Sequence, residues 1–123
     1  DRGKGERAVT IKVSQRDVGG VTVVDLTGRI TLGEPSARLR ELVRDLLNQG
    51  QKKILLNLGD VAYIDSSGLG ELVSGYTAVK NQGGQLKLLN LTKKVTDLLQ
   101  VTKLYTVFEV HDNETAAIQS FHS

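Results

Sequence analysis

The sequence predicts a single α/β domain, built as a mixed, mostly parallel sheet of about five strands flanked by about four helices. Short apolar runs alternate along the chain with segments whose apolar residues recur every three to four positions, in the order ββαβαβαβα. The length of 123 residues is near that of one domain and is long enough to bury a core without disulfides or metal. The first strand is expected to lie antiparallel at one edge of the sheet.

The fold is expected to begin with a hairpin. The run VTIKV at 9–13 alternates apolar and polar residues, and a second alternating run starts at Val21 after the turn pair Gly19-Gly20. Residues 1–8 are polar and lack apolar periodicity. We therefore expect a disordered tail over 1–8 and the domain over 9–123.

An amphipathic helix and a buried strand are predicted next. Pro35 suits the first turn of the helix and Gly50 its end. The apolar residues at helical spacing between them are Leu39, Leu42, Val43, Leu46 and Leu47. The run KKILLNL, which ends before Gly59-Asp60, is continuously apolar, as is typical of a central parallel strand covered on both faces.

The second half of the chain repeats this alternation. A helix follows the run DVAYIDSSG, and the residues expected on its inner side are Leu69, Leu72, Val73, Tyr76 and Val79. We expect QLKLLN to form a strand, TKKVTDLLQVTKL a short helix, TVFEV the last strand and NETAAIQSF a final helix that begins at an asparagine cap.

The composition excludes several classes of function. No apolar run approaches the roughly 18 residues that span a bilayer, so no membrane partner is expected. The formal charge is only +2 and the aromatic residues are not interleaved with basic clusters, which argues against a nucleic acid partner. The chain has no cysteine, which excludes disulfides and thiolate metal sites, and the lack of a signal-peptide pattern favours the cytoplasm.

The residues Asp65-Ser66-Ser67-Gly68 lie where a buried strand turns into a helix, which is where open α/β sheets form their sites. Ser67 as N-cap would stabilise the helix by about 1 kcal/mol, with Asp65 favouring the helix dipole. One hydroxyl is enough for a cap, and Glu71 lies four residues after Ser67 rather than the three of a capping box. An exposed hydroxyl here could instead carry a phosphate that disturbs a docked partner.

Two glycines interrupt the same helix. Gly70 and Gly75 each cost up to about 1 kcal/mol relative to alanine. With Ser74 and Ala78 they make one side of the helix small. That side either lets the backbone of a partner approach closely or packs tightly against a neighbouring helix of the same domain, and the sequence leaves both possibilities open.

The chain resembles STAS domains, and most closely the bacterial anti-sigma factor antagonists. The resemblance rests on VVDLTGRI (23–30), ILLNLGDVAYIDSSGLGELVSGY (54–76), the segment 83–110 and the closing ETAAIQSF. Its most specific part is the Asp-Ser-Ser-Gly-Leu-Gly block between strand and helix. The resemblance implies a dephosphorylated antagonist that binds an anti-sigma factor serine kinase and so frees a sigma factor.

The resemblance also implies which residues act. The phosphate acceptor of the family directly follows the aspartate of the motif, which carries over to Ser66, with Ser67 as the less favoured neighbour. Phosphorylation by the kinase would end the complex, and a metal-dependent serine phosphatase would regenerate the active form. The expected partner-binding residues are Thr31, Glu34, Asp65, Ser66, Ser67, Gly68, Gly70, Glu71, Ser74 and Gly75. Many antagonists carry an acidic residue in the loop where this chain has Arg29 and Thr31.

Signatures of an enzyme are weak. Ser66 has no evident base, because both histidines come after residue 110 in the sequence. No complete glycine-rich nucleotide motif occurs, and Asp60, Asp65 and Glu71 lack metal-ligand spacing. We therefore expect a protein that is not an enzyme and has no catalytic residue, no metal and no cofactor.

Two hypotheses about function follow. The first is a binding module that is switched by phosphorylation. The alternative is a non-switching STAS subunit that docks constitutively in a transport assembly or another regulatory complex. The intact Ser66 favours the first hypothesis.

Overall fold

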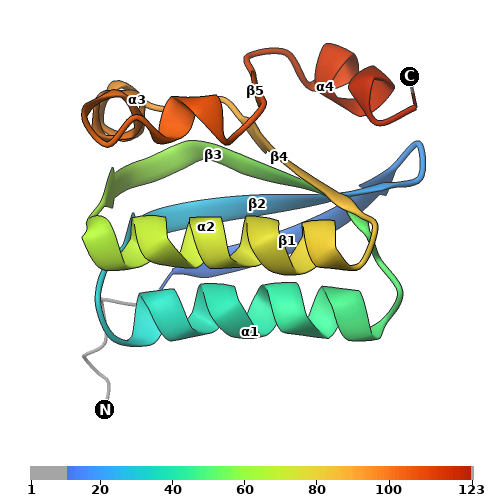
Figure 1. The fold of residues 1–123 in the computed structure, drawn as a ribbon, viewed down its shortest axis with the longest axis horizontal. Helices are drawn as coiled ribbons and strands as arrows, with labels where there is room; N and C mark the ends of the chain where they lie inside the picture. Colours follow the sequence, from blue (N-terminus) through green and yellow to red (C-terminus); the bar gives the residue numbers. More distant parts are fainter. Residues whose placement is uncertain (1–10, 123) are drawn as a thin grey trace.

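The computed structural model describes residues 11–122, which form a five-stranded sheet and four α-helices (Figure 1). The strands, in their order across the sheet, are β1 (Lys12–Val18), β2 (Val21–Ile30), β3 (Lys53–Ile64), β4 (Gln85–Leu89) and β5 (Val110–His111). The helices are α1 (Glu34–Asn48), α2 (Ser66–Asn81), α3 (Lys93–Val101) and α4 (Glu114–Ser120). Among the strands of the described residues, only β1 and β2 pair antiparallel. The predicted α/β class and edge strand are confirmed, whereas the predicted tail and Val9 lie outside the described residues.

Two apolar clusters hold the layers together. α1 and α2 lie side by side on one side of the sheet and α4 lies on the other (Figure 1). The main core fills the space between the sheet and α1 and α2, and α3 contributes Val95 and Leu99 to it. The smaller cluster under α4 consists of Val21, Val23, Leu55, Leu89, Ala117 and Phe121. β3 therefore buries side chains on both faces, as its continuous apolar run predicts.

The hairpin and the first helix form as the sequence predicts. Gly19 and Gly20 have φ angles of 58° and 82°, and a two-residue turn with positive φ at both positions matches the twist of the strands that it joins. In α1, Pro35 lies in the first turn, and all five apolar residues predicted to face inward are buried. The helix ends at Asn48, just before Gly50.

β3 is longer than predicted. The sequence places its end before Gly59-Asp60, but the strand continues to Ile64. The register with β2 shifts twice along this stretch, so the extra residues of β3 are taken up as bulges instead of ending the strand. The added length carries the chain to Asp65, where α2 starts.

The extent predicted for the last strand is wrong. Leu104–Thr106 forms a short 3₁₀ turn, and only Val110–His111 pairs with β4. Phe108 is buried, with its ring centroid 5.5 Å from that of Tyr76 in an edge-on arrangement. Burying this ring directs the chain into the core at the position where TVFEV predicts an extended strand.

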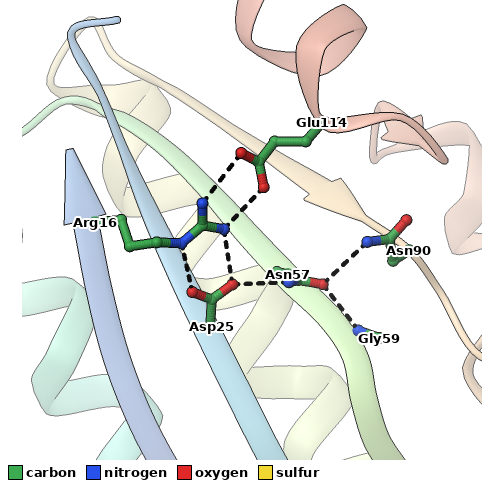
Figure 2. A network of polar contacts seen from close by, with 6 residues as sticks. All are labelled: Arg16, Asp25, Asn57, Gly59, Asn90 and Glu114. Carbon is green, nitrogen blue, oxygen red and sulfur yellow. Dashed lines mark hydrogen bonds and ion pairs between the residues drawn. The ribbon is translucent and has the colours of Figure 1, made fainter. Parts of the chain in front are cut away.

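A polar network on the α4 side of the sheet connects α4 to the strands (Figure 2). The guanidinium of Arg16 donates to both carboxylate oxygens of Asp25, at 2.7 and 3.0 Å, and to both of Glu114, at 2.8 and 3.1 Å. This pairing holds the pKa of each carboxyl group below its usual value. Arg16 thus connects β1 to β2 and to the first turn of α4.

The network continues into the bulged part of β3. The side-chain amide of Asn57 donates to Asp25 at 2.7 Å, and its oxygen accepts from the N–H of Gly59 at 3.1 Å and from Asn90 at 3.4 Å (Figure 2). Asn57 therefore fixes the segment that precedes the junction of β3 and α2.

Candidate functional site

Asp65 organises the junction between β3 and α2. One carboxylate oxygen accepts from the N–H of Gly68 at 2.9 Å and caps α2, and the other accepts from the N–H of Leu32 at 3.0 Å. The pKa of Asp65 lies below its usual value, chiefly because of the Gly68 N–H and further because of the Leu32 N–H. Asp65 is therefore ionised at neutral pH and joins the start of α2 to the loop between β2 and α1.

Capping of α2 by Ser67, the alternative role that the sequence offers, does not occur. α2 begins at Ser66, and the capping oxygen comes from Asp65, one residue before the helix. Aspartate is as good an N-cap as serine, so the helix needs neither hydroxyl for this purpose. Ser66 is exposed and Ser67 is half-buried. The first residue of a helix of 16 residues thus presents an exposed hydroxyl.

Packing within the domain accounts for two glycines of α2. A Cβ atom at Gly68 would overlap the carbonyl oxygen of Ile30 and lie 2.8 Å from a side-chain carbon of Ile64. A Cβ atom at Gly75 would lie 3.3 Å from a methyl group of Val43 in α1. Both glycines are buried. Of the two possibilities that the sequence leaves open for Gly75, close packing against a neighbouring helix is the one that the structure supports.

Gly70 is different. It is exposed, and a Cβ atom built there would meet nothing within 4 Å outside its own helix. It lies one turn after Ser66 on the exposed side of α2, which continues with Ser74 and Thr77. No contact within the described residues requires a glycine at position 70. The fold therefore gives no stabilising contact that compensates for the low helix propensity of this glycine.

Two exposed apolar residues lie near the start of α2, and neither was predicted from the sequence as part of the site. Leu32 is 77% exposed in the loop that Asp65 anchors, and Val101 is 81% exposed at the end of α3. Val101 and Ser66 line the same shallow hollow between the start of α2 and α3. The position of Leu32 next to Gly33, between a strand and a helix, is the signal that could have placed it on the surface.

The remaining predicted residues lie in the loop before α1 and on the neighbouring surface of α1 and α2. Thr31 is half-buried, and its carbonyl accepts from the backbone and hydroxyl of Ser36, while Glu34 is exposed at the first position of α1. Glu71 is ion-paired with Arg40 of α1 at 2.6 Å. This pair bridges the two helices beside a narrow groove.

The groove has a volume of about 220 Å³ and includes Ser74 and Gly75 in its lining. It lies apart from the hollow at Ser66, because the two share no lining residue. The structure thus brings Asp65, Ser66 and Leu32 together and places Ser74 and Gly75 in a second surface feature.

Other kinds of site find little support in residues 11–122. Within them, no cluster of three or more histidine or acidic side chains has the arrangement of a metal site. None of the helices found there combines the length and hydropathy needed to cross a bilayer.

Comparison with known protein families identifies the family of this chain. The family model described as the STAS domain matches residues 12–117. The chain belongs to the STAS domain family. The anti-sigma-B factor antagonist of Bacillus subtilis strain 168 is 32% identical to this STAS domain over 111 residues, which cover 90% of this chain and 96% of the relative.

Solved structures agree with the fold of this STAS domain. The Thermotoga maritima protein tm1081 has a TM-score of 0.84 at 27% identity, covering 90% of this chain and 95% of that chain. The phosphorylated form of the Bacillus cell fate determinant SpoIIAA has a TM-score of 0.68 at 20% identity, with coverages of 90% and 98%. A sulfate transporter family protein from Wolinella succinogenes has a TM-score of 0.72 at 20% identity, with coverages of 84% and 85%. The last two likenesses concern the fold alone.

Proposed function

We propose that this STAS domain is an anti-sigma factor antagonist that is switched by phosphorylation of Ser66. In the unphosphorylated state it binds an anti-sigma factor serine kinase and frees a sigma factor, and phosphate on Ser66 ends the complex. A serine phosphatase restores the binding form, and we place the cycle in the cytoplasm. The observation that carries the proposal is the exposed Ser66 hydroxyl beside an aspartate that already caps the helix.

The surroundings of Ser66 suit a protein partner. Leu32 and Val101 expose large apolar side chains, and burying them in an interface would be favourable. Ser66 and Gly70 add a stretch of helix without bulky side chains. A partner can therefore approach the start of α2 closely and cover the neutral hydroxyl, which is the contact that a phosphate would disrupt.

In the phosphorylation step this chain acts as the substrate. The Ser66 oxygen attacks the γ-phosphorus of ATP, the bond to the leaving oxygen of ADP breaks, and the hydroxyl proton passes to a base of the kinase. Asp65 is a poor base for this step, because its carboxylate already accepts two backbone N–H groups and its pKa is lowered. We therefore assign the catalytic groups to the kinase.

Kinship supports the antagonist role over the transport alternative. The Bacillus subtilis relative is named as an anti-sigma-B factor antagonist and is matched over nearly its whole length. The fold alone does not separate the two hypotheses, because a sulfate transporter family protein shares it. The exposed acceptor hydroxyl favours the switching module.

The proposal is tested by phosphate transfer from ATP in the presence of the cognate kinase. We expect one phosphate per chain, detected as an increase of about 80 Da in intact mass and mapped to Ser66. Ser66→Ala should abolish transfer, and Ser67→Ala should leave it unchanged. Phosphate on Ser67, or full transfer to Ser66→Ala, would contradict the assignment.

Gly70→Ala separates the needs of the fold from the needs of the partner. The added methyl group meets open space and improves helix propensity, so the free energy of unfolding should rise by up to about 1 kcal/mol. If the kinase backbone approaches this turn, affinity should fall by about tenfold, which corresponds to about 1.4 kcal/mol. Thr77→Ala, at an exposed position two turns further along α2, is the control that should leave affinity unchanged. Unchanged affinity for Gly70→Ala would remove Gly70 from the proposed interface.

A further inference from the structure

The hollow beside Ser66 contains a cation that no carboxylate neutralises. Its lining includes Tyr63, Asp65 and Ser66 on one side and Lys94, Asp97 and Val101 of α3 on the other. Asp97 is ion-paired with Lys93, which lies one helical turn before it, at 3.0 Å. Among residues 11–122, Lys94 has no ion-pair partner, although it lines the same hollow as the Ser66 hydroxyl.

A second cation lies at the same aromatic ring. The Arg29 guanidinium carbon is 4.8 Å from the centroid of the Tyr63 ring, and Nζ of Lys94 is 6.0 Å from it. Both contacts are within the range of a cation–π interaction. Arg29 pairs with Tyr63 in the register of β2 and β3, and within the described part of the chain it also forms no ion pair. Tyr63 therefore gathers two positive charges next to the start of α2.

We propose that Lys94, supported by Arg29, is the receptor for the phosphate carried by phosphorylated Ser66. This inference rests on the proposed function and adds an intramolecular binding site to it. A phosphate at Ser66 brings a charge of about −1.5 to −2 at neutral pH, and a lysine ammonium offers three N–H donors to its oxygens. Phosphate and ammonium belong to opposite walls of one hollow, so an ion pair between them closes that hollow.

The charges that face the phosphate favour this pairing. Asp65 repels it and cannot move away, because both of its oxygens are held by backbone N–H groups of α2 and of the loop before α1. Asp97 on α3 is neutralised by Lys93. The attractive charges are Lys94 on α3, which lines the hollow, and Arg29 on β2, which lies behind it at the Tyr63 ring and outside the lining. Phosphorylation therefore changes the surface that we propose binds the kinase in two ways. It adds negative charge at Ser66, and it draws the Lys94 side chain toward Ser66, past the exposed side chain of Val101.

The test is a phosphorus NMR titration of protein that carries phosphoserine at position 66, inserted during translation. Because no kinase is needed, failure of the proposed switch and failure of this inference are separate results. Lys94→Gln should raise the second pKa of the phosphate by about 0.5, which is the effect of one charge about 5 Å away in water. Arg29→Gln should raise it by a smaller amount.

Lys80→Gln is the matched control, because it removes the same charge from an exposed residue that forms no ion pair among residues 11–122. It should change the phosphate pKa by less than about 0.2, since Lys80 lies 14 residues after Ser66 in α2, about 21 Å along the helix, where a charge is strongly screened. A second readout is the thermal midpoint, which should be lower for Lys94→Gln than for Lys80→Gln only in the phosphorylated proteins. Equal pKa shifts for the two lysine variants, or no shift for Lys94→Gln, would overturn the inference.

Discussion

Replacing Ser66 with aspartate is expected to weaken binding to the kinase by about a hundredfold while the fold survives. A partner that covers Ser66 must then remove water from two adjacent carboxylates, one of them the ionised Asp65. Two like charges about 4 Å apart repel by about 1 kcal/mol in water but by about 4 kcal/mol at an effective dielectric constant of 20. The difference of about 3 kcal/mol corresponds to roughly two orders of magnitude in affinity.

The fold should tolerate the same charge, because it lies at the N-terminus of α2. A negative side chain there gains about 0.3 to 1 kcal/mol from the helix dipole. Thermal unfolding should accordingly give the same midpoint for Ser66→Asp and the unmodified protein within about 2 °C, or a slightly higher one.

Calorimetry with the kinase measures this effect, and two variants isolate its cause. Ser66→Asn adds the bulk of aspartate without its charge and should retain most of the affinity. Ser66→Ala removes the acceptor oxygen and should bind persistently in the presence of ATP. Equal losses for the aspartate and asparagine variants would show that bulk and not charge disrupts the interface, and equal affinities for alanine and aspartate would exclude the switch.

Gly68→Ala is expected to lower the stability more than any other addition of a single methyl group within the Asp-Ser-Ser-Gly-Leu-Gly motif. Its Cβ atom would overlap the Ile30 carbonyl oxygen, which accepts the N–H of Asp65 at 3.2 Å. The start of α2 would have to move away from β2, which also breaks the cap that Asp65 makes to the Gly68 N–H. Overpacking and a lost cap together should lower the free energy of unfolding by about 3 kcal/mol.

Urea denaturation of Gly68→Ala and Gly70→Ala makes a controlled comparison. The two variants carry the same substitution in the same helix, two residues apart, but only position 68 lacks space for a methyl group. The midpoint should fall for the first and stay equal or rise for the second. A similar fall in both would mean that contact with Ile30 does not determine the effect.

The sequence was sufficient for features that depend on local pattern. Alternating residues and the Gly19-Gly20 pair predict the hairpin, and helical spacing around Leu42 and Leu46 predicts α1. The pattern fails where a tertiary contact decides the outcome. TVFEV has the composition of a strand, but the ring of Phe108 packs on Tyr76 and redirects the backbone.

The sequence indicates the residue types of the proposed site but not their geometry. The motif points to Ser66 as the proposed acceptor, but which of three polar residues caps α2 depends on where the helix starts, and a shift of two residues transfers the cap from Ser67 to Asp65. Leu32 and Val101 could not be found from hydrophobicity, because an apolar residue is expected to be buried unless the packing shows otherwise.

The order of the strands has a consequence for how the protein emerges from the ribosome. Each strand pairs with the one made just before it, so the sheet can grow in the direction of synthesis without waiting for a distant partner. All residues proposed to act around Ser66 lie between 29 and 101, ahead of α4. The bond between Arg16 and Glu114 spans 98 positions and can close only after the last helix has been made. At about 5 to 20 residues per second, a nascent chain therefore exposes the proposed phosphate acceptor for seconds before this ion pair can form.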